Sequence, residues 1–268
     1  MGIPKKLYKY ESFTTQSLSN LKSQILYFGS PLDFNDPYDC AITARIKEPT
    51  DSDVESFRGL YSKIPDFPEQ TKQALAQAST DELRSWLHGV GNRSISDIVH
   101  KAIDGKGVSC FSEKHNDLLM WSHYGDKNKG FCLEFDTSFE PFNKAKKVKY
   151  TEEIPSISIT DAIVKNNFEQ LFDLYCTKST SWEYEAEWRC IHHHVGTKWT
   201  YESEALTGVY FGSNVPDQVI DIVCLILQGQ NTHVKYWKGK RSDTKFELEF
   251  EDFNYIPYIV AKDRGLVT

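Results

Sequence analysis

The chain has 268 residues, of which 40% are hydrophobic and 26% charged, and this composition excludes a disordered chain. With 38 acidic and 31 basic residues the net charge is −7, which excludes a protein that coats nucleic acid through a basic surface. The longest fully apolar run, residues 222–227, is far too short to span a membrane, and the N-terminal residues show no secretory leader. We therefore expect a cytoplasmic protein with no membrane partner.

The first part of the chain combines short strands with a long helical stretch. Residues 7–10 predict a strand, 17–23 a short helix and 25–28 a second strand. The segment 29–37 is rich in Asn, Asp and Pro. These residues favour turns, because Asn and Asp cap backbone amides and Pro fixes φ. Residues 51–104 are polar and favour helix, and we interpret them as a helical insertion or lid.

The rest of the chain alternates strands and helices. We expect strands at 108–111, 130–135, 144–150, 186–192 and 209–211, helices at 116–124, 159–177 and 216–227, and a closing antiparallel pair at 233–237 and 245–250. Asn116 is expected to cap its helix. This order predicts an α+β fold, with a mostly antiparallel central sheet and inserted helices, in a single domain over 1–268.

Three alternating carboxylates are the first candidates for chemistry. In an extended chain Glu183, Glu185 and Glu187 share one face with Arg189, and neighbours are ~7 Å apart. Such a row raises the pKa of one member unless a cation compensates, and suits acid–base work or stabilisation of a developing cation. Loss of one of three like charges should leave folding intact. The alternative is a solvated strand face with a salt bridge to Arg189.

Two further groups of side chains suit ligand binding. Ser109 and Ser112 place small hydroxyls on one strand, where they can bond a ligand or simply cap the strand end. Trp121 and Tyr124 offer flat rings and His123 a hydrogen-bonding ring, although packing of a short helix would explain all three.

The residues that could bind a metal ion do not occur at the sequence spacing typical of metal sites. No two of the six cysteines are closer than fourteen positions, so we expect free thiols in a reducing compartment. His192 and His194 could share a strand face, but supporting ligands are missing. No nuclease signature surrounds the carboxylates Asp36, Asp39, Glu113 and Asp117. We therefore expect no metal.

Six motifs together resemble a bacterial family called domain of unknown function 2971. They are LYKY at 7–10, FNDPYD at 34–39, GVSCFSE at 107–113, MWSHYGDKNKGFCLEFD at 120–136, WEYEAEWR at 182–189 and GVYFG at 208–212. They span about 205 residues in the family's order. The family label implies no established activity.

A more distant similarity, in layout, is to the ADP-ribosyltransferase superfamily, which includes the DarT-like toxins. Its members open with a strand that ends in a NAD-binding residue, carry a Ser- or Tyr-bearing strand mid-chain, and place a catalytic Glu on a late strand, often as ExE. The matching positions are Tyr8, Lys9 or Tyr10, then Ser109 or Ser112, then Glu185 and Glu187. The first strand lacks the usual Arg or His, and Ser-Cys-Phe-Ser replaces Ser-Thr-Ser.

This resemblance implies an ADP-ribosyltransferase-like fold and an enzyme of bacterial toxin or phage-defence type. It would cleave the nicotinamide–ribose bond of NAD without a metal and transfer ADP-ribose to a nucleic acid or protein. Glu187 would stabilise the charge that develops on the ribose, and Glu185 would orient or deprotonate the acceptor. Ser109 would steady the ribose, and nicotinamide would stack on Tyr10, Trp121 or Tyr124. A cognate antitoxin or defence partner is implied.

Two other functions stay open. One is a non-catalytic domain that recognises a nucleotide or a peptide, for which we expect NAD binding without turnover. The other is a metal-dependent nuclease, whose activity EDTA would abolish.

Overall fold

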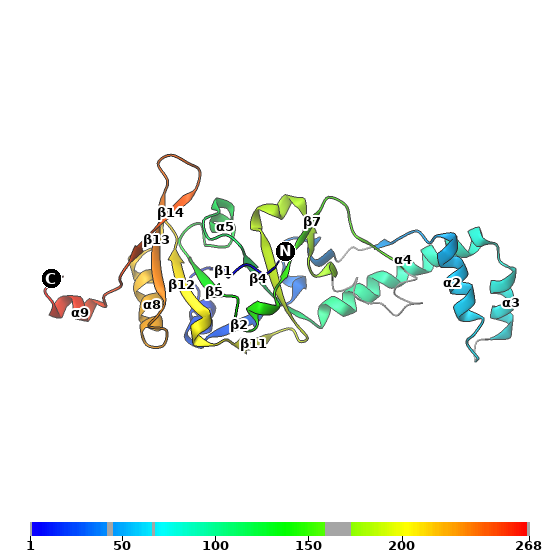
Figure 1. Ribbon diagram of the computed structural model, residues 1–268, viewed down its shortest axis with the longest axis horizontal. Coiled ribbons are helices and arrows are strands. Elements are labelled where there is room, and N and C mark those ends of the chain that lie inside the picture. Colours follow the sequence, from blue (N-terminus) through cyan, green and yellow to red (C-terminus); the bar gives the residue numbers. More distant parts are fainter. Residues whose placement is uncertain (1, 42–44, 66–67, 159–172, 267–268) are drawn as a thin grey trace. The chain divides into compact units, whose positions relative to one another are not determined.

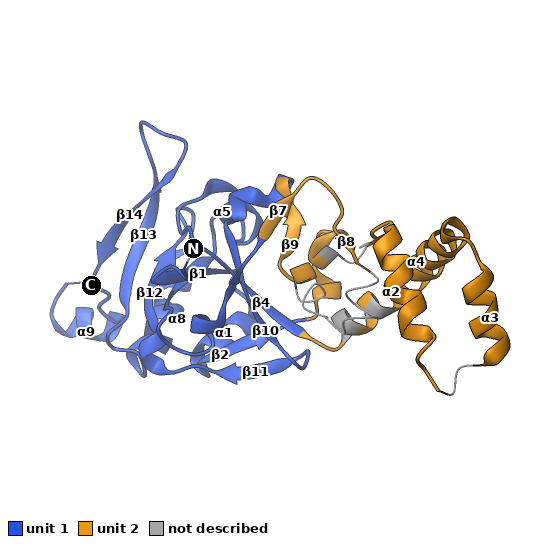
Figure 2. Ribbon diagram, turned by 45° about the vertical axis from the view of Figure 1, so that its right-hand side comes forward, with its two compact units in different colours: residues 1–29, 107–148, 181–268 blue, residues 30–106, 149–180 orange. Residues whose placement is uncertain are grey.

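The computed structural model describes residues 2–41, 45–65, 68–158 and 173–266 (Figure 1). The chain divides into two compact units (Figure 2). Unit 1 comprises residues 1–29, 107–148 and 181–268, and unit 2 comprises residues 30–106 and 149–180. The expected insertion at 51–104 therefore belongs to unit 2.

An eight-stranded sheet forms the centre of unit 1, in the order β14-β13-β12-β5-β1-β4-β10-β6. Its strands are β1 (Lys6–Glu11), β4 (Gly107–Ser112), β5 (Phe131–Asp136), β6 (Lys146–Lys147), β10 (Glu187–His192), β12 (Leu206–Phe211), β13 (Lys235–Arg241) and β14 (Leu248–Phe253). Neighbouring strands are antiparallel except β12 and β13. The predicted α+β class and mostly antiparallel central sheet are confirmed.

The core of unit 1 lies on one face of this sheet. Because side chains alternate along a strand, Leu7, Phe111 and Leu133 all reach this face. Helix α8 (Asp217–Gln228) buries Val219, Ile220, Val223, Cys224 and Leu227 there, at the three- and four-residue spacing of one helix side. Helix α1 (Thr15–Lys22) packs on α8, and strand β2 (Ile25–Phe28) pairs with β11 (Thr197–Thr200). The other helices of this unit are α5 (Leu118–His123) and α9 (Tyr258–Asp263).

Unit 2 is mainly helical. Its helices are α2 (Asp51–Tyr61), α3 (Glu69–Gln77) and α4 (Thr80–Asp104), so the helical character predicted for 51–104 is confirmed. Two short parallel pairs accompany them: β3 (Arg45–Ile46) with β8 (Ser156–Ile157), and β7 (Lys149–Thr151) with β9 (Thr177–Ser179). The predicted turn is present, since the Tyr38 amide donates to the Asp36 carboxylate. Next to this turn, Asp39 forms a buried salt bridge of 3.1 Å with Lys178.

The connection between α5 and β5 is a left-handed turn. Asp126, Lys127 and Asn128 have φ angles of 49°, 54° and 67°. The Asn128 carbonyl accepts a hydrogen bond from the Asn214 amide. A Cβ on Gly130 would lie 2.3 Å from the Glu11 carbonyl, so only glycine allows β1 to approach this closely.

Three local expectations need correction or fall outside the described residues. Asp117, not Asn116, caps α5, and it accepts from two amides of the first turn. The expected edge strand at 144–150 is two strands, β6 and β7, in separate sheets. Residues 159–172 of the expected helix at 159–177 lie outside the described residues, and Thr177 begins β9. Within the described chain, no helix has the length and apolarity that a membrane crossing requires.

Candidate functional site

Tyr8, Ser112 and Glu187 form one row across three neighbouring strands. Tyr8 of β1 lies opposite Ser112 of β4, and Ser112 lies opposite Glu187 of β10. Directly opposed residues of antiparallel strands point to the same face. The row continues to Glu134 of β5, which lies opposite Tyr8. Four polar residues from distant parts of the sequence therefore share one face, the face away from the α8 core.

The sheet is joined weakly at this row. Strands β1 and β4 pair at one position only, Tyr8 with Ser112, whereas β1 and β5 pair at six positions. Beyond this position the Lys9 ammonium donates to the Cys110 carbonyl at 3.4 Å. The row therefore lies at the junction between two halves of the sheet.

Lys9 and Ser109 lie on the opposite face from Glu187. Ser109 is opposite Cys190, three positions from Glu187, and side chains alternate along a strand. The Ser109 hydroxyl is buried in the core without a hydrogen-bond partner among the described residues. Lys9 extends over the Phe111 ring, 5.6 Å from its centroid. Ser109 is therefore not on the face of Glu187, where steadying the same ribose would require it to be.

Glu187 is held in a buried ion pair. Its Oε1 and Oε2 accept hydrogen bonds from Nε and Nη2 of Arg189, both at 2.8 Å. Glu187 is 4% exposed and Arg189 fully buried. Two parallel bonds of this kind fix the plane of the carboxylate and favour its charged form.

The three carboxylates do not form the predicted strand face. Residues Thr180–Glu185 form a 3₁₀ helix, η4, and Ala186 follows with a φ of 45°. The strand begins only at Glu187. As a result Glu183 is exposed, while Glu185 is buried.

Two predicted ligand-binding hydroxyls hold Glu185 instead. The Tyr124 hydroxyl donates to Oε1 of Glu185 at 2.6 Å, and the Ser112 hydroxyl donates to its backbone carbonyl, also at 2.6 Å. The Lys114 amide donates to the Ser112 oxygen in turn. Glu185 is thus fixed beside the row by residues from β4 and from the end of α5.

The aromatic candidates differ in how accessible they are. Trp121 is fully buried, and its ring nitrogen donates to the His115 carbonyl at 2.7 Å. Tyr10 is also buried, and its ring meets Trp121 edge-on at 5.1 Å. These two rings pack the protein interior, so the expectation that they stack on a ligand is wrong for the conformation described. His123 is exposed, and Tyr8 and Tyr124 are half-buried.

Glu134 and His115 are site residues that the sequence analysis did not single out. Glu134 accepts hydrogen bonds from the hydroxyls of Tyr210 and Thr207, at 2.8 and 2.7 Å. Burial and the Glu134 charge raise the pKa of Tyr8 to about 12. The His115 ring packs on Tyr8 and Tyr210, and burial lowers its pKa, so the ring is neutral near pH 7. The sequence signal for Glu134 was a carboxylate inside the otherwise apolar strand expected at 130–135.

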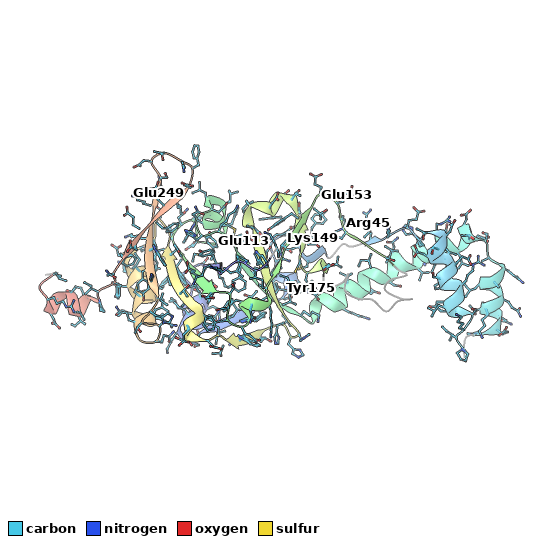
Figure 3. All side chains as sticks on the ribbon, in the orientation of Figure 1. Arg45, Glu113, Lys149, Glu153, Tyr175 and Glu249 are labelled. Atoms are coloured by element: carbon cyan, nitrogen blue, oxygen red, sulfur yellow. The ribbon has the colours of Figure 1, made fainter. Side chains whose placement is uncertain are left out.

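Glu113, labelled in Figure 3, links the end of β4 to β10 and β6. Its Oε1 accepts hydrogen bonds from the Trp188 ring nitrogen at 2.6 Å and from Lys147 at 2.8 Å. Burial raises the pKa of Glu113, but these two hydrogen bonds outweigh burial and hold it below its ordinary value of 4.5.

We expect Glu113→Gln to destabilise the protein by about 1 kcal/mol at pH 7, because one partner of a charged hydrogen bond at a partly exposed site is lost. A lowered folded-state pKa contributes stability above the ordinary pKa of the group, and this contribution is lost as the pH falls through the folded-state pKa. The difference between wild type and variant should therefore shrink below about pH 4. Urea unfolding of both proteins at pH 7 and pH 3.5 measures this difference in stability. A difference that grows in acid would contradict the lowered pKa of Glu113.

No disulfide joins any of the six cysteines, in agreement with the sequence analysis. Burial raises the pKa of the Cys110 thiol well above its ordinary value, which disfavours the nucleophilic thiolate. Among the described residues, no three His, Cys, Asp or Glu side chains are grouped as a metal site requires.

A family model matches part of the chain. The model of a family described as "Protein of unknown function (DUF2971)" matches residues 120–190, which include α5, β5 and most of β10. Over these residues the chain is similar to the DUF2971 family. No curated protein and no solved structure matches the chain significantly.

Proposed function

We propose that this chain is an NAD-dependent ADP-ribosyltransferase whose site is the row at the junction of β1, β4 and β10. The observation that carries the proposal is the register of Tyr8, Ser112 and Glu187. These residues stand on the first, mid-chain and late strands that the superfamily layout assigns to NAD binding and catalysis. Residues on separate strands that only capped their own turns would have no reason to share one row.

The chemistry is a substitution at the ribose carbon that carries nicotinamide. The bond to nicotinamide breaks and its electron pair leaves with the ring, while an acceptor nucleophile forms a new bond to the same carbon and loses its proton. A fixed carboxylate stabilises the positive charge that develops on the ribose more than it stabilises the ground state. Glu187 takes this role, and Arg189 holds it ionised and oriented.

Glu185 accepts the proton of the acceptor nucleophile in this proposal. Tyr124 orients its carboxylate, and Ser112 orients its backbone. Tyr8 in the row and His123, next to Tyr124, supply the accessible rings. We assign no ligand contact to Ser109, which lies on the core face, or to Trp121, whose ring packs on Tyr10.

Tyr124→Phe tests this arrangement with the loss of one oxygen atom. We expect NAD cleavage, measured as nicotinamide release with EDTA present, to fall roughly 10- to 100-fold, the scale of a misplaced catalytic group. The matched control is Tyr255→Phe, which removes a hydroxyl that donates to Asp221 at 2.9 Å, beside α8. The control should cleave NAD at the wild-type rate. Equal rates in all three proteins would remove Tyr124 and Glu185 from the site.

One observation favours the recognition-domain alternative. Glu187 and Ser112 are buried and already bonded within the protein. If wild type releases no nicotinamide but melts at a higher temperature with NAD, the alternative replaces the proposal. Activity that EDTA abolishes would indicate the nuclease. A toxin or phage-defence role, with a cognate partner, follows only if NAD is cleaved.

A further inference from the structure

We propose that two copies of this chain associate through an apolar surface on α8 and the segment that follows β14. This surface, here called the α8–α9 patch, consists of Ile222, Leu225, Ile256, Tyr258 and Ile259. Each of these side chains is between 39% and 64% exposed. Exposed apolar side chains gathered in one place mark interaction sites more often than single ones do.

Helix α8 carries apolar residues on two sides. Its inner side packs into the core of unit 1, as a surface helix does. Ile222 and Leu225, three positions apart, lie next to each other on the outer side, where polar residues are the norm. The sequence of α8 therefore provides more apolar surface than its own core uses.

Two hydrogen bonds hold the following segment beside α8. The Tyr255 hydroxyl donates to Asp221 at 2.9 Å, and the Gln228 side chain donates to the Tyr255 carbonyl at 3.3 Å. Asp221 and Gln228 flank Ile222 and Leu225 in α8. Residues 256–259 follow Tyr255 and so begin next to the outer side of α8. They include the first two residues of α9, which lies to one side of α8 (Figures 1 and 2).

Helix α9 has the features of a helix that must pack against another surface to be stable. It has a formed end, since Gly265 has a φ of 66° and the Leu266 amide donates to the Ala261 carbonyl. Six residues are too few for a helix to be stable alone in water. Ala261 is its one buried residue among those described, while Tyr258 and Ile259 are exposed.

Charge selects a second copy as the occupant. Helix α8 contains Asp217 and Asp221 and no basic residue. Lys238 of β13 pairs with Asp217 at 3.2 Å, so Asp221, which accepts a hydrogen bond from the Tyr255 hydroxyl, is the α8 carboxylate that the argument rests on. At the end of α9, Lys262 and Arg264 outnumber Asp263. A two-fold axis brings the same patch of both copies together. Each basic α9 end can then lie near the acidic α8 of the other copy, and opposite charges steer the pair together.

Sedimentation equilibrium of the full chain over a range of concentrations tests the proposal. We expect a monomer–dimer equilibrium in wild type. Leu225→Glu and Ile259→Glu should each raise the dimer dissociation constant by roughly 30-fold, the scale of a lost interface anchor. Phe246→Glu is the matched control, because Phe246 is fully exposed on the loop between β13 and β14, outside the patch. It should leave the dimer unchanged.

Arg264→Glu provides a second test that burial does not complicate, since Arg264 is exposed. It should weaken the dimer, and more so at low salt than at high salt, because exposed charges are screened. A wild-type chain that stays monomeric at every concentration would overturn the proposal. So would a dimer that resists both patch variants, or one that Phe246→Glu weakens equally. The outcome does not depend on whether the chain cleaves NAD.

Discussion

Glu187→Gln should destabilise the protein by about 3 kcal/mol, because it removes a neutralising carboxylate from the buried guanidinium of Arg189. This reverses the expectation from sequence, which was that loss of one of three like charges leaves folding intact. Glu183→Gln is the matched control. Glu183 is exposed, so its change should stay within about 0.5 kcal/mol. Urea unfolding of the two variants measures the difference, and equal stabilities would contradict the buried pair.

The same variant should lose NAD cleavage for a separate reason. If Glu187 stabilises charge on the ribose, nicotinamide release should fall by roughly 10²–10³-fold. The double variant Glu187→Gln, Arg189→Met separates the two effects, because replacing both partners of a buried pair can restore stability. We expect the double variant to regain part of its stability and none of its activity. Activity that returns with stability would show that Glu187 is structural only.

Trp121→Ala should destabilise the protein by about 3–5 kcal/mol, the usual cost of deleting a fully buried aromatic side chain. Its ring packs on Tyr10, and its nitrogen bonds the His115 carbonyl, so the loop between β4 and α5 should loosen as well. Trp86→Ala is the control and should destabilise the protein less, since Trp86 is 52% exposed. Thermal and urea unfolding provide the measurement. A stable Trp121→Ala protein that loses only NAD affinity would instead favour the stacking role.

Elements with a strong local period could be predicted from the sequence. Helix α8 carries a regular apolar pattern and lies within two residues of its predicted limits, as strand β1 does. The segment WEYEAEWR was wrongly predicted to be extended throughout, because its carboxylates alternate with other residues as they would in a strand. The 3₁₀ helix up to Glu185 and the left-handed Ala186 interrupt that alternation, and no local pattern predicts them.

The site could be predicted only in part, because it depends on register. Ser109 and Ser112 differ by an odd number of positions, so one strand cannot direct both to the same face. That much is contained in the sequence. Which of the two meets Glu187 depends on how β4 pairs with β10, and this pairing joins residues more than seventy positions apart. The ion pair between Glu187 and Arg189 follows from their two-residue spacing, and the sequence had suggested it.

The single-position pairing of β1 with β4 has a consequence for cooperativity. A continuous hydrogen-bonded ladder makes a sheet open as one block, but here the ladder connects its two halves only through Tyr8 and Ser112. Packing across the junction joins Phe111 to Phe135 on the core face and the His115 ring to Tyr8 on the face of the row. A ligand bound along the row would span the junction and tie the two halves together. Binding would then contribute rigidity that the empty sheet lacks, and the protein's resistance to local opening would depend on its ligand.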